Sequence, residues 1–136
     1  MMKKLLIAVA LTTVLGAVQA RSTVALIEPS RVVLASSGDV LNTDKVKSAI
    51  VRAGARRQWA VHADAPGKLV MKYNKQNKHE VVVEIAYDTS GYQIRYVSST
   101  NMKYETEAGV PMIHPFYNKW VTTLSQDIVT EVSLAP

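Results

Sequence analysis

The feature that most constrains this 136-residue chain is a series of four runs of alternating apolar and polar residues. The runs span 58–63, 69–74, 80–87 and 92–98, and short segments rich in turn-forming residues separate them. Alternation with a period of two is typical of a β-strand with one buried face. Connections this short join antiparallel neighbours, because a parallel pair needs a crossover of about a dozen residues. The runs therefore predict a four-stranded antiparallel meander.

One face of this predicted sheet is apolar. It carries Trp59, Val61, Leu69, Met71, Val83, Ile85, Ile94 and Tyr96. The opposite face carries Lys72, Glu84 and Arg95 among smaller side chains, and we expect it to be largely solvated. The apolar face needs a covering layer of helices.

Two segments have helical periodicity and supply that layer. The first follows the capping residues Asn42, Thr43 and Asp44, and we expect it to end near residues 54–57. The second begins at Pro115, which suits a first helical position. The resulting order is α-β-β-β-β-α, an α+β two-layer sandwich with a four-stranded antiparallel meander and two helices on one face. Residues 42–134 form this single domain.

The first twenty residues have the layout of a cleaved secretory signal. Lys3 and Lys4 precede an apolar run, and Ala20 ends the segment with a small residue at the expected cleavage point. We expect residues 1–20 to be removed, residues 21–41 to form an extended N-terminal arm, and the mature protein to be periplasmic or extracellular, with no transmembrane segment. The chain has no Cys, which excludes lipoprotein anchoring, disulfides and thiolate chemistry.

Several short strings within about residues 43–129 resemble a family. They are Ala49-Ile50, Ala53-Gly54, Trp59, Ile94-Arg95-Tyr96, the segment 98–104, Ile113-His114, Tyr117-Asn118-Lys119-Trp120-Val121, Leu124 and Asp127-Ile128. On these strings the chain resembles small exported proteins and lipoproteins of Gram-negative bacteria whose function is unknown. The resemblance implies a periplasmic or surface location and a small α+β domain, and it implies no reaction. This chain departs from the lipoprotein members in lacking their cysteine.

One group of residues suggests catalysis. His114 is a candidate general base paired with Asp127 or Glu105, and Tyr104 is a further candidate; this hypothesis describes a small periplasmic hydrolase or lyase. The alternative interpretation is structural. His114 lies where a helix N-cap is expected, and Tyr117 falls at a position on the apolar, core-facing side of the helix. We expect no metal, because the three His are dispersed, and no cofactor.

A cluster of lysines suggests an anion-binding surface instead. Lys68, Lys72, Lys75 and Lys78 gather around one predicted hairpin, and Tyr117 and Asn118 are further candidate binding residues. The lysines also have a plainer role in keeping a sheet edge soluble. We expect no nucleic acid partner, because the protein is exported and aromatic residues are not interleaved with the lysines.

These observations favour a non-enzymatic, monomeric binding module of the cell envelope. Its expected partner is another protein or an anionic envelope component, bound by the exposed sheet face or the basic hairpin. An open sheet edge also allows a partner strand to add to the sheet.

Overall fold

The computed structural model describes residues 23–35 and 40–135. The predicted signal segment, residues 1–20, lies outside them. Within the described residues, no helix is long and apolar enough to cross a membrane.

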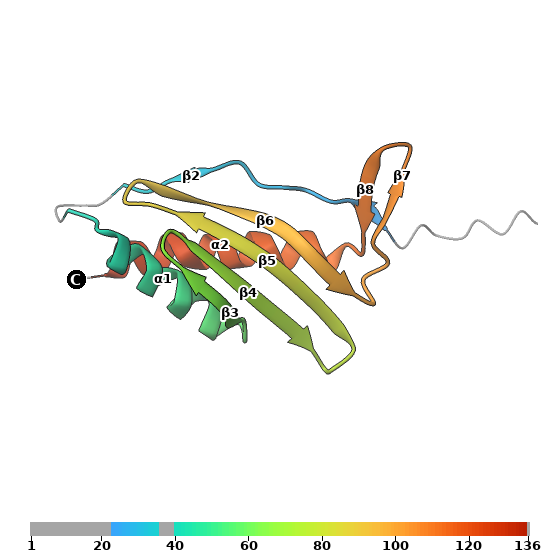
Figure 1. Ribbon diagram of the computed structural model, residues 1–136, viewed down its shortest axis with the longest axis horizontal. Coiled ribbons are helices and arrows are strands. Elements are labelled where there is room, and N and C mark those ends of the chain that lie inside the picture. The colour runs from blue at the N-terminus through green and yellow to red at the C-terminus, as the bar shows by residue number, and fades with distance from the viewer. Residues whose placement is uncertain (1–22, 36–39, 136) are drawn as a thin grey trace, which may run out of the picture.

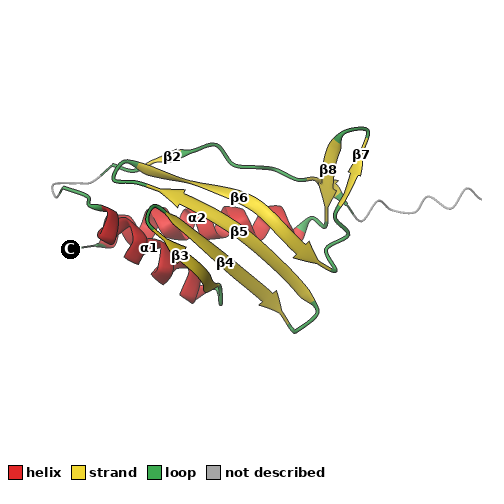
Figure 2. Ribbon diagram, viewed as in Figure 1, coloured by secondary structure: helices red, strands yellow, loops and turns green. Residues whose placement is uncertain are grey.

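The described chain forms two helices and two antiparallel sheets, as Figures 1 and 2 show. The larger sheet has the order β2-β6-β5-β4-β3. Its strands are β2 (Val32–Val33), β3 (Ala60–Ala65), β4 (Lys68–Lys75), β5 (His79–Tyr87) and β6 (Gly91–Thr100). The helices α1 (Thr43–Arg56) and α2 (Phe116–Leu134) lie together on one face of this sheet. The predicted α+β fold and its meander are confirmed, and β2 makes the sheet five-stranded.

A smaller sheet stands at one end of the molecule. It has the order β1-β8-β7, and it consists of β1 (Val24–Ala25), β7 (Glu105–Glu107) and β8 (Val110–Ile113). The sequence did not indicate the β7–β8 hairpin, because its strands are short and show no clear alternation.

The core lies between the helices and the larger sheet. From α1 it takes Val46, Ala49, Ile50 and Ala53, all fully buried. From α2 it takes Tyr117, Val121, Leu124, Ile128 and Val132, and Leu69, Met71, Val83, Ile85 and Ile94 face them from the strands. Gly54 marks the closest approach of α1 to the sheet, because a Cβ at this position would overlap the Met71 side chain and crowd Trp59.

The prediction for the first strand needs correction. β3 begins at Ala60 and every residue in it is exposed, so Val61 is a surface residue and does not belong to the core. β3 is one of the two edge strands of the larger sheet, and its side chains stay exposed although Lys47 of α1 forms an ion pair with Asp64 near its end. The register shifts around His62, between Val61 and Ala63, which interrupts the expected alternation.

The N-terminal arm lies along the sheet. We call its described part, residues 23–35, the strap. β1 pairs with Met112 and Ile113, and β2 pairs with Gly91 and Tyr92. Between these points Arg31 donates to both carboxylate oxygens of Asp88, at 2.7 and 2.8 Å. The strap is therefore held at both ends, by the small sheet at β1 and by the edge of the larger sheet opposite β3 at β2.

Candidate functional site

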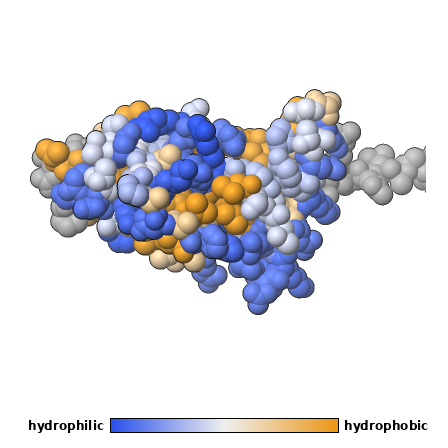
Figure 3. All heavy atoms as spheres, in the orientation of Figure 1, coloured by the Kyte–Doolittle hydropathy of each residue, from blue (hydrophilic) through white to orange (hydrophobic). Residues whose placement is uncertain are grey.

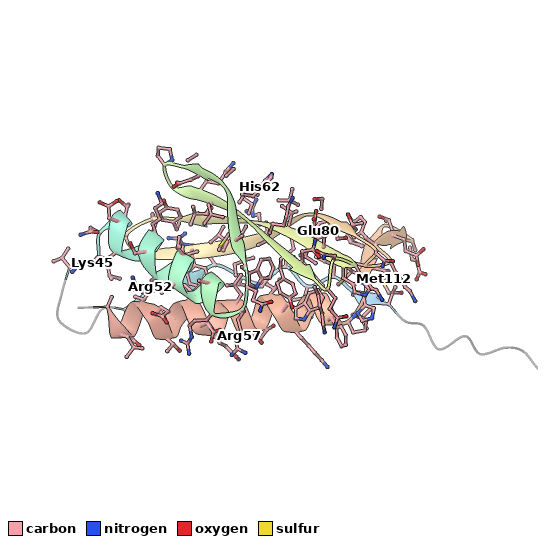
Figure 4. The ribbon with its side chains drawn as sticks, turned by 90° about the horizontal axis from the view of Figure 1, so that it is seen from below. Lys45, Arg52, Arg57, His62, Glu80 and Met112 are labelled. Carbon is pink, nitrogen blue, oxygen red and sulfur yellow. The ribbon has the colours of Figure 1, made fainter. Side chains whose placement is uncertain are left out.

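A cleft opens where the C-terminal end of α1 meets β4 and α2. Its lining residues are Arg56, Arg57, Gln58, Trp59, Tyr73, Trp120 and Thr123, and its volume is about 330 Å³. We call it the aromatic cleft. Figure 4 labels Arg57, which lies between the end of α1 and the middle of α2.

The turn after α1 forms one wall of the aromatic cleft. Gln58 has the left-handed backbone conformation, with φ of 66°, and this reverses the chain direction directly after the helix. The Trp59 amide then donates to the Gly54 carbonyl oxygen at 2.8 Å. The turn therefore carries the Trp59 ring back beneath α1, where its side chain is buried and packs beside the cleft.

Three aromatic rings from three elements form the apolar part of the cleft. The Tyr73 ring on β4 lies 5.4 Å from Trp59 and 4.9 Å from Trp120 between ring centroids. The row continues along α2, because Phe116 lies 5.8 Å from Trp120. The Lys75 ammonium sits 5.1 Å from the Phe116 centroid and 5.8 Å from that of Trp120. Ring pairs at such spacings stabilise one another by about 0.5–1.5 kcal/mol beyond their buried area, so the contacts favour this arrangement of the wall.

The polar residues that line the cleft are Arg56, Arg57, Gln58 and Thr123, and carboxylates farther along α2 pair with the arginines. Positions 120, 123, 127 and 131 share one face of α2. Arg57 donates to Asp127 at 2.9 Å, while Arg52 and Arg56 both donate to Glu131, at 3.1 and 3.0 Å. The two carboxylate side chains are mostly buried, and the arginines are about half exposed. The rim therefore presents both hydrogen-bond donors and acceptors, with its charges largely paired.

The structure separates His114 from Asp127. His114 directly precedes the residues that begin α2, and its Nδ1 accepts the Phe116 amide at 3.1 Å. Asp127 is roughly 16 Å along the helix axis from Phe116, and it is paired with Arg57. Tyr104 stacks on Tyr96 with centroids 4.7 Å apart.

His114 therefore has a structural role at the start of the helix. Its pKa is lowered, mainly because of partial burial and then because of His79, Lys103 and Lys75. A lowered pKa keeps the ring neutral, which preserves Nδ1 as an acceptor. Glu105, the other proposed carboxylate, is an exposed residue of β7.

The two further candidate binding residues serve the fold. Tyr117 is fully buried, and burial together with Glu28 and Tyr96 raises its pKa. Asn118 accepts the Ile27 amide through Oδ1 and donates through Nδ2 to the Ala25 carbonyl, both at 3.0 Å. Both hydrogen bonds of the Asn118 side chain are thus made to the backbone of the strap.

The predicted lysine cluster divides into different environments. Lys68 and Lys72 lie 3.5 and 3.7 Å from Glu84 and Glu80 on the adjacent strand. Lys75 contacts the aromatic row, and Lys78 lies in the exposed turn between β4 and β5. Half of the cluster is therefore paired, which weakens it as a surface for anions. We expected no aromatic rings among the lysines, and this is wrong at Lys75, whose ammonium lies near the Phe116 and Trp120 rings.

The open face of the sheet is mixed in character. Figure 3 shows apolar surface over the middle of β4 and β5, with hydrophilic residues around it. Val70 and Val82 face this side, opposite the core positions of their strands, and the ion pairs of Lys68 and Lys72 flank them. Like the rim of the aromatic cleft, this face carries paired charges, but its apolar side chains are the aliphatic Val70 and Val82 in place of aromatic rings.

Among residues 23–35 and 40–135, no group of three or more His, Asp or Glu side chains is close enough to hold a metal ion. Neither a family model, nor a curated protein, nor a solved structure matches the chain.

The sequence placed Trp59 on the apolar face of the predicted sheet and did not indicate the cleft. The available signal was the spacing of Trp120, Thr123 and Asp127, which places an aromatic, a hydroxyl and a carboxylate on one helix face.

Proposed function

We propose that this protein is an exported, non-enzymatic binding module of the cell envelope, and that the aromatic cleft is its ligand-binding surface. The observation that carries the proposal is the convergence of three aromatic rings and a paired polar rim on one cleft. Binding sites commonly combine apolar walls with a few positioned polar groups. Cleavage after Ala20 delivers the module to the periplasm or beyond.

The chemistry of the cleft supports binding over catalysis. The described residues that line it include two hydroxyl groups, on Tyr73 and Thr123, and no His or Lys. The carboxylates at its rim, Asp127 and Glu131, are engaged by arginine donors. A hydrolase using His114 would need a carboxylate to orient that ring, and Asp127 lies more than two helical turns away. The other candidate, Glu105, is exposed, and the groups that shift the His114 pKa by their charge are the basic residues His79, Lys103 and Lys75.

Native mass spectrometry of the protein recovered from its own host tests the proposal. We expect a cleaved chain beginning at Arg21 that carries additional non-covalent mass. Trp120→Leu removes an aromatic wall of the cleft and should abolish that mass. Tyr104→Leu is the matched control, because it removes an exposed ring outside the cleft and should leave the mass in place.

Two results would contradict the proposal. If Trp120→Leu folds and retains the bound mass, the ligand occupies another surface. If the intact mass begins at Met1, the protein is not exported by signal cleavage. A melting curve for each variant checks that it is folded.

A further inference from the structure

We infer that the aromatic cleft binds a saccharide, with one pyranose ring seated against Tyr73 and Trp120 and the adjoining sugar units extending out of the cleft. This inference rests on the proposed function and names the ligand class of the same site. It follows from the aromatic rings that form the wall of the cleft, from the hydrogen-bonding groups of its rim, and from its volume.

The wall has the chemistry that sugar rings require. Aromatic faces carry partial negative charge, and the C–H groups on one face of a pyranose are weakly positive, so the two surfaces attract one another. Tyr73 and Trp120 are partly exposed and meet edge to face, with an angle of 70° between the ring planes. Their arrangement forms a concave corner, which fits a puckered ring better than a flat base.

The rim matches hydroxyl groups. A hydroxyl both donates and accepts hydrogen bonds, so a dense set of them is best satisfied where donors and acceptors alternate. Arg57 and Asp127 provide such a pair, and Gln58 and Thr123 add an amide and a hydroxyl. Each arginine retains N–H donors beyond the one that binds its carboxylate.

The same rim disfavours phosphate polymers. Nucleic acid affinity comes mainly from unpaired Lys and Arg that neutralise phosphates. Here Arg52, Arg56 and Arg57 are already paired with Glu131 and Asp127, and those carboxylates repel phosphate. A neutral saccharide meets no such repulsion, so its affinity should be insensitive to salt.

The volume of the cleft fits a partly enclosed ligand. At about 330 Å³ it lies at the lower end of small-molecule sites. The row of rings continues from Trp120 to Phe116, and Phe116 is 41% exposed. A second unit of a linear oligosaccharide placed beside the first would meet the ammonium groups of Lys75 and Lys119, which lie 5.1 and 5.7 Å from the Phe116 ring centroid and can donate to sugar hydroxyl groups.

Titration of the mature protein with chitotetraose, a linear tetramer of N-acetylglucosamine, tests the inference, with cellotetraose as a second saccharide. Both tryptophans of the chain line the cleft, so tryptophan fluorescence reports on this site alone. We expect a saturable change with at least one saccharide, at equal affinity in low and physiological salt. Trp120→Leu should weaken binding by about tenfold or more.

Arg57→Gln and Tyr104→Leu complete the design. Arg57 is exposed, so its replacement should preserve the fold while weakening saccharide binding. Tyr104→Leu should bind like the unmodified protein. If Trp120→Leu has a markedly lower melting temperature than the unmodified protein, Arg57→Gln serves as the test of the site in its place.

The outcomes separate this inference from the proposed function. If neither saccharide changes the fluorescence, the saccharide inference is wrong, whereas a host-derived mass that depends on Trp120 still supports a binding cleft. If oligothymidylate binds more tightly than the sugars and salt weakens it, the site is a nucleic acid surface and the inference is overturned. Saccharide binding that Trp120→Leu and Arg57→Gln leave unchanged also overturns it.

Discussion

Replacing Asn118 by Ala should open one end of the strap without unfolding the domain. The Asn118 side chain joins α2 to the strap through two hydrogen bonds, to Ile27 and Ala25. Both bonds are solvent-exposed, so water replaces them when the side chain is removed. A hydrogen bond of this kind contributes about 0.5–1.5 kcal/mol, so the two together contribute about 1–3 kcal/mol. The opening equilibrium should therefore shift by a factor of about 30, within a range of roughly 5 to 150.

Amide hydrogen exchange measures this shift at single residues. The Leu26 amide donates to the Pro111 carbonyl, so it reports opening without itself contacting Asn118. Its protection should fall by the factor above. The Leu34 amide, bonded to Ser90, should be unchanged, because Arg31 and Asp88 hold that end of the strap independently.

Lys119→Ala is the matched control, since Lys119 lies next to Asn118 but its ammonium sits over the Phe116 ring. Unchanged protection of the Leu26 amide in Asn118→Ala would show that the Asn118 side chain does not hold this end of the strap. Equal loss of protection at Leu26, Leu34 and the core amides would also contradict the prediction, because it would mean that the strap opens only when the domain unfolds.

Three further predictions concern stability and pH. Leu124→Ala should lower the free energy of unfolding by about 2–5 kcal/mol in urea denaturation, because Leu124 is fully buried, and a loss below 1 kcal/mol would contradict this core. Hydrogen bonds from Ser90 and Arg31 lower the pKa of Asp88 to about 2, so its stabilising contribution should be complete above pH 3.8 and disappear as pH falls through about 2; a carboxyl NMR midpoint near 3.8 would be inconsistent. His114→Ala should cost about 1 kcal/mol. Because the His114 pKa is lowered from 6.5, the native contact is complete above that pH and weakens below it, and thermal melting against pH should show this dependence only with His114 present.

The sequence predicted the parts of the fold that depend on local periodicity. The alternation in residues 69–98 predicted β4, β5 and β6, and the spacing of apolar residues after Asn42 and Pro115 predicted both helices. Short turns determined the antiparallel order. These features depend on neighbouring residues, so they are visible without the tertiary structure.

The features that the sequence missed depend on contacts between distant segments. Val61 alternates like a core residue, but β3 lies at the edge of the sheet beside a register shift and leaves it exposed. Asn118 binds the strap some ninety positions earlier in the chain. The aromatic cleft joins Trp59, Tyr73 and Trp120 from three elements, so its shape depends on how α1 and α2 pack against β4.

The central claim is that the aromatic cleft is the surface that binds a ligand. The chain contains two tryptophans, and both line the cleft, so the two indole N–H signals in a nitrogen-15 NMR spectrum report on it directly. The decisive measurement is this spectrum before and after addition of soluble envelope extract from the host. If the aromatic cleft binds the ligand, both indole signals shift, and they return when the bound material is removed. Unshifted indole signals, with changes confined to the open face of β4 and β5 or to the Lys78 turn, would contradict the central claim.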